Sequence, residues 1–247
     1  MTTLYALLES RLIDGNLIAL LQSLTRESGE AFELVTAAPL AAIIAHPSAS
    51  SPPISRELLL HYAATVERLT EAVSLLPMRH GSTLPSSAEV ISMLQLNAVS
   101  CIDALKRVYN KAEYSLRLFA SPEQQKNAIS AGVDGDNSLP EALQGETQNK
   151  RYLAEKYRVH LAEEHHRQYI ETLKSRLRKD LGEVSLDIEF KKPLPSGFIA
   201  DMVLLVERNS KERLRSIVKN IQSNYPEYDV ILTGPWPPYN FSQIRMQ

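Results

Sequence analysis

Several protein classes are excluded by what this sequence lacks. Its 247 residues include a single cysteine, Cys101, so no internal disulfide can form, which fits a reducing compartment. Its 27 basic and 29 acidic residues nearly balance, whereas a nucleic-acid-binding surface needs a strong basic excess. We therefore expect no nucleic-acid partner.

Long hydrophobic runs are also missing. The longest nearly apolar stretch, Leu34 to Ala45, contains Pro39 and falls short of the roughly 20 residues that span a bilayer. The N-terminus has no basic start followed by an apolar stretch, which a secretion signal would need. We expect a soluble, cytoplasmic protein without a membrane partner.

Motifs for phosphate binding and nucleophilic catalysis do not occur: there is no Walker loop, GxGxxG, GxSxG or CxxC pair. The histidines of the segment HLAEEHHRQ, at positions 160, 165 and 166, lack the four-residue spacing of a helical zinc pair, and we interpret them as a solvated helix face. The stretch GVDGDNS lacks the spacing of an EF-hand calcium loop. We predict that the protein has no metal site and no cofactor, and that it is not an enzyme.

The first half of the chain shows strand-like and helical patterns. Three short segments are predicted strands: Leu4–Glu9, Ala31–Ala37 and Leu40–Ala45. A helix capped by Ser55 follows, with apolar residues at three- and four-residue steps from Leu59 to Leu76. A second helix is predicted to begin at Ser86, which has capping-box spacing to Glu89, and its apolar stripe continues to Val108.

The sequence of the second half of the chain predicts strands and helices in the order β-α-β-β-α-β. The four strands are Glu113–Phe119, Glu183–Phe190, Phe198–Val206 and Tyr228–Thr233. The two helices span residues 150–181 and 209–226. This order indicates a ferredoxin-like domain, a four-stranded antiparallel sheet in the order 4-1-3-2 with two helices on one face.

The predicted fold class is therefore α+β with two domains. Residues 1–110 form an N-terminal α+β domain, and residues 111–247 form the ferredoxin-like one. A polar, turn-rich stretch at about residues 121–148 is predicted to be a mobile insertion.

Two short groups of residues are candidate sites in the first domain. In PMRHG, Arg79 and His80 stand beside a tight turn, which suits an anion site or half of a catalytic pair. The structural alternative is a turn in which Gly81 takes a positive φ. Cys101 lies on an apolar helix stripe, and we expect it to be a buried core residue instead of a reactive thiol.

The C-terminal segment GPWPPYNF holds the chain's only tryptophan between prolines. Prolines fix φ, and rigid aromatic rings lose little entropy on binding, so we predict partner-binding roles for Pro235, Trp236, Tyr239 and Phe241. The alternative is that the segment folds back and closes a core, and the two interpretations are compatible.

Three blocks of the sequence resemble one known family. LTGPWPPYNF closely resembles the C-terminal signature of the gas vesicle protein F/L family (GvpF/GvpL). LLPMRHG resembles its LPxRFG-like stretch, with His80 where phenylalanine is common, and KAEYSLRLF resembles a strand with a characteristic glutamate, here Glu113. The blocks occur in the family's order, so the resemblance covers nearly the whole chain.

The resemblance implies a non-enzymatic accessory or minor structural protein of gas vesicles, the gas-filled organelles that provide buoyancy. It implies assistance in vesicle assembly by binding the small, hydrophobic shell protein GvpA and limiting its aggregation during nucleation, with other gas vesicle accessory proteins as further candidate partners. It also implies two α+β domains, the second ferredoxin-like.

The physics is compatible with that role, because unassembled shell subunits expose apolar surface and strand edges. We place the contact at or near the predicted edge strand Tyr228–Thr233 and the aromatic segment after it. Two alternatives stay open: a ligand-sensing ferredoxin-like module, and a hydrolase that uses Arg79, His80 and a distant carboxylate.

Overall fold

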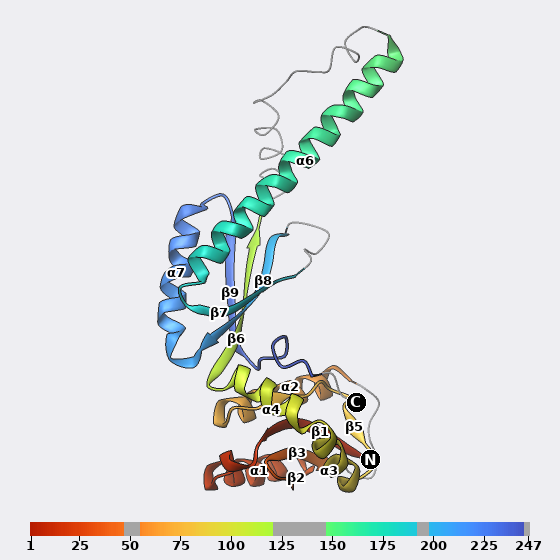
Figure 1. The fold of residues 1–247 in the computed structure, drawn as a ribbon, viewed down its shortest axis with the longest axis vertical. Helices are drawn as coiled ribbons and strands as arrows, with labels where there is room; N and C mark the ends of the chain where they lie inside the picture. Colours follow the sequence, from red (N-terminus) through yellow and green to blue (C-terminus); the bar gives the residue numbers. More distant parts are fainter. Residues whose placement is uncertain (47–54, 121–146, 192–197, 245–247) are drawn as a thin grey trace. The chain divides into compact units, whose positions relative to one another are not determined.

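The protein is described by a computed structural model, which covers residues 1–46, 55–120, 147–191 and 198–244. The predicted mobile insertion, at about residues 121–148, lies outside these ranges apart from Thr147 and Gln148, where a helix begins. The strands form two sheets and helices pack beside them, as expected for a mixed α and β protein (Figure 1). The chain divides into two compact units. The first comprises Met1–Tyr114, Leu205–Arg208 and Gly234–Gln247, and the second comprises Ser115–Leu204 and Asn209–Thr233.

The sheet of the first unit is antiparallel and contains the three predicted strands. Its members are β1 (Thr2–Glu9), β2 (Ala31–Ala37), β3 (Leu40–His46), β4 (Leu76–Pro77) and β5 (Thr83–Leu84). The order is β2-β3-β1-β4, and β5 also pairs with β1. A register shift between Leu4 and Ala6 interrupts the β1–β3 ladder. The alternation of β1 side chains between the two faces of the sheet therefore changes at this point.

Four helices pack on this sheet: α1 (Gly15–Ser28), α2 (Arg56–Ala72), α3 (Ser87–Leu96) and α4 (Ala98–Val108); a 3-10 turn, η1, spans Ser10–Leu12. The predicted caps are confirmed, since the side chains of Ser55 and Ser86 accept the backbone N–H groups of Leu58 and Glu89. Asp14 caps α1 in the same way.

Of the two long helices predicted for this unit, the first is shorter than expected and the second is broken into two. Helix α2 ends at Ala72, and Leu76 belongs to β4, because the residue before Pro77 is disfavoured in the α region. The second predicted helix is divided between α3 and α4, whose axes meet at 80°. Asn97 stands at the break, where its side-chain amide donates to the Met93 carbonyl and competes with helical continuation.

The core of the first unit lies against β1 and β3. A cluster of buried apolar residues joins both strands to α1 and α2; it includes Tyr5, Leu8, Leu17, Leu24, Ile43, Val66 and Leu69. Residues of α3 and α4 are buried as well, among them Val90, Leu94, Cys101 and Leu105. Cys101 is thus a core residue as predicted, and burial raises the pKa of its thiol, which keeps it protonated.

The second sheet has the strands β6 (Lys111–Phe119), β7 (Ser185–Phe190), β8 (Phe198–Glu207) and β9 (Asp229–Trp236), in the order β7-β8-β6-β9. The helices are α6 (Gln148–Leu181) and α7 (Lys211–Asn224), and a 3-10 turn, η3, spans Arg208–Ser210. Both the β-α-β-β-α-β element order and the strand order 4-1-3-2 are those expected from the sequence. Strand β8, at the centre, is buried along almost its whole length, and β9 is an edge strand.

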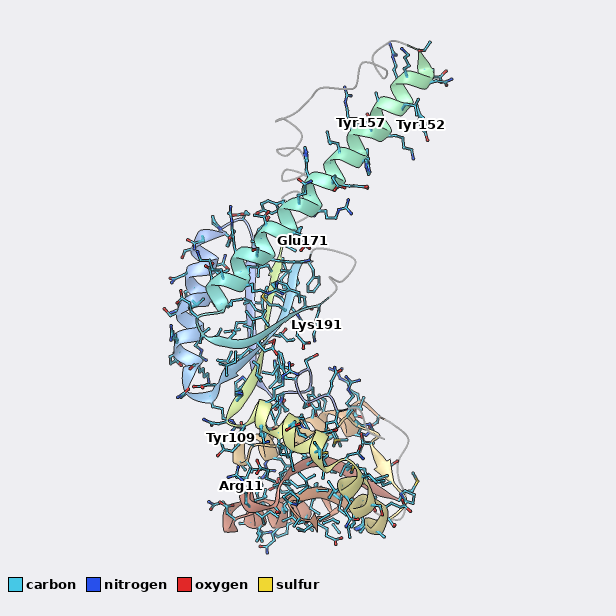
Figure 2. All side chains as sticks on the ribbon, viewed as in Figure 1. Arg11, Tyr109, Tyr152, Tyr157, Glu171 and Lys191 are labelled. Atoms are coloured by element: carbon cyan, nitrogen blue, oxygen red, sulfur yellow. The ribbon has the colours of Figure 1, made fainter. Side chains whose placement is uncertain are left out.

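Helix α6 buries its leucines near its C-terminal end. Leu173, Leu177 and Leu181 are buried there, and α6 packs against α7. Towards the other end Ala154 and Ala162 are buried, but Leu153 is half exposed and Tyr152 more so (Figure 2). No single helix in the described ranges is long and apolar enough to cross a membrane, and only the bent pair α3 and α4 reaches that length and composition together.

Candidate protein-interaction site

The C-terminal aromatic segment starts at a glycine that lies against β6. Gly234 has a φ of +121°, a conformation that L-residues rarely adopt. A Cβ atom at this position would lie 2.9 Å from the Glu113 carbonyl oxygen and 2.9 Å from the Tyr114 ring. Only glycine therefore lets β9 approach β6 this closely at the point where the segment leaves the sheet.

A buried carboxylate holds the far end of the segment. Glu113 is 5% exposed, and its Oε2 accepts the backbone N–H of Asn240 at 2.9 Å. Its Oε1 accepts the side-chain amide of the same asparagine. Hydrogen bonds to a charged acceptor are stronger than neutral ones, so this two-point contact fixes the chain between Gly234 and Asn240.

Two of the four predicted partner-binding residues face inward. Phe241 is 1% exposed, and the Arg107 guanidinium lies 5.5 Å from its ring centroid, within cation–π range. Tyr239 is half-buried and packs on the cluster between the sheet, α1 and α2. Burial, with the Glu67 carboxylate as a lesser cause, raises the pKa of Tyr239 to about 12. Both rings contribute to the first unit's core.

The other two residues are exposed. Trp236, the last residue of β9, is 41% exposed, and Pro235 beside it is also exposed. The segment thus combines both interpretations offered by the sequence: its distal part closes a core, and its proximal part presents an indole and a proline to solvent. The fixed points at Gly234 and Asn240 give this surface a rigid backbone.

The PMRHG motif forms a turn. The Ser82 N–H donates to the Arg79 carbonyl at 3.1 Å, and Gly81 has a φ of +89°, as the structural alternative predicted. The His80 ring meets the Tyr62 ring edge-on, with centroids 5.1 Å apart. Arg79 lines a hollow of about 300 Å³ together with Tyr239, which brings the PMRHG and GPWPPYNF motifs to one place.

The sequence profile of one family, described as gas vesicle synthesis protein GvpL/GvpF, matches residues 4–243. The chain belongs to this family. A GvpF/GvpL relative with a curated description, gas vesicle protein F1 of Halobacterium salinarum, is 25% identical over 76 residues, which are 31% of this chain and 36% of that protein. The aligned part thus spans about a third of that relative's length.

Two crystal structures of GvpF proteins have a similar fold. GvpF from Anabaena sp. PCC7120 matches with a TM-score of 0.76 at 15% identity, over 99% of this chain and 96% of that one. GvpF from Microcystis aeruginosa matches with a TM-score of 0.72 at 12% identity, over 98% and 99%. The GvpF/GvpL resemblance seen in the sequence is therefore confirmed, and the fold agrees along nearly the whole chain.

A hollow lies where the two GvpF/GvpL motifs PMRHG and GPWPPYNF meet. The residues lining the hollow beside Arg79 include serines and a glutamine, and no carboxylate is among them in the described part of the chain. Within the described ranges, no group of three or more His, Cys, Asp or Glu side chains is arranged to hold a metal ion. Among the described lining residues, Arg79 therefore has no carboxylate beside it of the kind that the hydrolase alternative calls for.

Sequence reasoning missed one structural residue of this region. Tyr62 appeared only as part of an apolar helix stripe, but its hydroxyl donates to the Leu4 carbonyl at 3.1 Å and lies 2.9 Å from the Met78 carbonyl. Tyr62 thereby links α2 to β1 and to the start of the PMRHG turn. A buried tyrosine usually finds a hydrogen-bond partner, but the sequence contains no signal for which one.

Proposed function

We propose that this GvpF/GvpL protein is a non-catalytic accessory or minor structural protein that assists gas vesicle assembly in the cytoplasm. It binds the hydrophobic shell protein GvpA and limits its aggregation during nucleation, and other gas vesicle accessory proteins are further partners. We propose also that residues 1–110 and 111–247 act as two domains, the second of them ferredoxin-like. Family membership supports the gas vesicle role.

The observation that supports a binding role is the exposed surface formed by the Trp236 indole and the Pro235 ring. An exposed indole on a flexible tail would lose conformational entropy on binding. Here the entropy is already lost, because Gly234 lies against β6 and Asn240 is held by the buried Glu113. A preorganised tryptophan is the residue type that most often dominates the energy of a protein interface. Tyr239 and Phe241 then contribute by fixing this surface.

Replacing Trp236 with alanine is expected to weaken the retention of GvpA by about 10-fold or more, the loss typical of a central interface tryptophan. The chain and GvpA are co-expressed, and the GvpA that stays soluble and co-purifies is measured. The folding of the variant should be unchanged, because the indole is 41% exposed.

The matched control is Tyr109→Ala. Tyr109, at the end of α4, is an aromatic residue of the same unit with a similar exposure of 47% (Figure 2). Its loss should leave GvpA retention unchanged. A wild-type chain that retains no GvpA would refute the proposed function. Equal retention by wild type and Trp236→Ala would refute only the contact through Trp236.

A further inference from the structure

Among the described residues, the outer edge of strand β2 is open beyond Phe32. This strand ends the sheet of the first unit, and all seven of its residues pair with β3 on the other side. In an antiparallel pair, residues alternate between those whose backbone groups point to the partner strand and those whose groups point away. The Phe32 N–H points away, because it donates to the Thr25 hydroxyl of α1 at 3.1 Å. The backbone groups of Leu34 and Thr36 therefore also point outward.

A groove runs beside this edge, between α1 and β2. It has a volume of about 680 Å³. Its apolar lining comes from Ile18, Leu21, Phe32 and Leu34, and Ile18 is 45% exposed. An added strand could bond to the outward backbone groups of β2 and place its alternate side chains in the apolar groove. Strand addition requires this combination.

The charges at the groove favour a particular kind of segment. Glu33 is already engaged by the His46 ring at 3.0 Å. The Arg26 Nε donates to the Gln22 carbonyl, and no carboxylate of the described residues lies within ion-pair distance of this guanidinium. A segment that carries a carboxylate opposite Arg26 therefore complements the groove better than a neutral or basic one.

The β9 edge of the second sheet is less accessible. At the start of β9, Gln222 of α7 donates to the Tyr228 carbonyl at 2.7 Å and accepts the Val230 N–H at 3.0 Å. Its amide thus occupies two backbone groups that an incoming strand would need. Pro235, near the other end of β9, has no N–H to offer. Of these two edges, β2 is the better acceptor of a strand.

We propose that the outer edge of β2 and the groove beside α1 bind an extended, apolar segment of the shell subunit, which adds to the sheet as a further strand. The identity of the partner rests on the proposed function. The backbone of the segment bonds to Leu34 and Thr36, its alternate apolar side chains enter the groove, and a carboxylate meets Arg26. This covers both an exposed strand edge and apolar side chains of a subunit that would otherwise aggregate.

Two substitutions test the site in the full chain co-expressed with GvpA. Thr36→Pro removes an outward N–H without removing a bond to β3, and Ile18→Lys places a charge in the groove. Each is expected to reduce the GvpA that co-purifies by about 10-fold, because a backbone hydrogen bond or apolar burial is lost. Thr36→Val keeps the N–H and should behave as wild type. Circular dichroism melting curves check that all variants fold.

The outcomes separate this inference from the proposed function. If wild type retains GvpA and folded Thr36→Pro and Ile18→Lys retain as much, the β2 site is refuted and the proposed function stands. If wild type retains none, the proposed function fails and this inference with it. Light scattering measures the oligomeric state of both chains. If the wild type is a dimer and Thr36→Pro is a monomer, a second copy of the chain covers the β2 edge, and the proposal is refuted.

Discussion

Replacing Phe241 with alanine is expected to lower the free energy of unfolding by about 3–5 kcal/mol, the usual loss for a buried phenylalanine. The ring is 1% exposed and lies beneath the Arg107 guanidinium, so its removal leaves a cavity and loses the cation–π contact. Urea titration followed by circular dichroism measures the change. Because Trp236 is the only tryptophan, its fluorescence reports in parallel on the segment itself.

Two comparisons make this prediction specific. Phe241→Leu keeps most of the apolar volume and should recover more than half of the loss. Trp236→Ala, which removes a larger but 41% exposed ring, should cost less than Phe241→Ala, because an exposed ring buries less apolar area. If Phe241→Ala changes the unfolding free energy by less than about 1 kcal/mol, the distal part of the segment does not close a core.

These expected differences within one segment show what the sequence could not specify. A proline-rich stretch has no helical or strand periodicity, so nothing in GPWPPYNF separates the exposed Trp236 from the buried Phe241. The contact that decides the matter joins Asn240 to Glu113, 127 residues earlier in the chain. The resemblance indicated Glu113 as characteristic but gave no partner for it.

The regular elements were predictable where periodicity was strong. The three N-terminal strands and the 4-1-3-2 strand order follow from alternation and from the order of elements. The errors occurred where a local side-chain contact overrides the pattern. The apolar stripe continues on both sides of Asn97, but the Asn97 side-chain amide donates to the Met93 carbonyl, and the helix breaks at this residue. Strands of two residues, such as β4, are too short for any pattern to indicate.

The parts of the candidate site depend on one another. Gly234 holds the proximal end of the segment against β6, and the Glu113–Asn240 contact and the buried Phe241 hold its distal end. The exposure of Trp236 is therefore a consequence of packing elsewhere in the segment. A substitution that releases the anchors should lower both stability and partner binding, whereas Trp236→Ala should lower binding with a smaller loss of stability.

Gly234→Ala is the substitution that tests the proximal anchor, and it is expected to cost about 2–5 kcal/mol of unfolding free energy. The added Cβ would meet the Glu113 carbonyl oxygen and the Tyr114 ring at 2.9 Å, so backbone must shift. A φ of +121° adds backbone strain for any L-residue. The measurement is again a urea titration, with the Trp236 emission maximum as a reporter of the local shift.

Gly15→Ala is the matched control, and its effect should have the opposite sign. Gly15 begins α1, has no positive φ and has no atom within 4 Å of an added Cβ. Alanine there restricts the unfolded chain and favours the helix, so stability should rise by up to about 1 kcal/mol. If Gly234→Ala is as harmless as Gly15→Ala, then β9 does not need to approach β6 this closely, and the rigid presentation of Trp236 loses its structural basis.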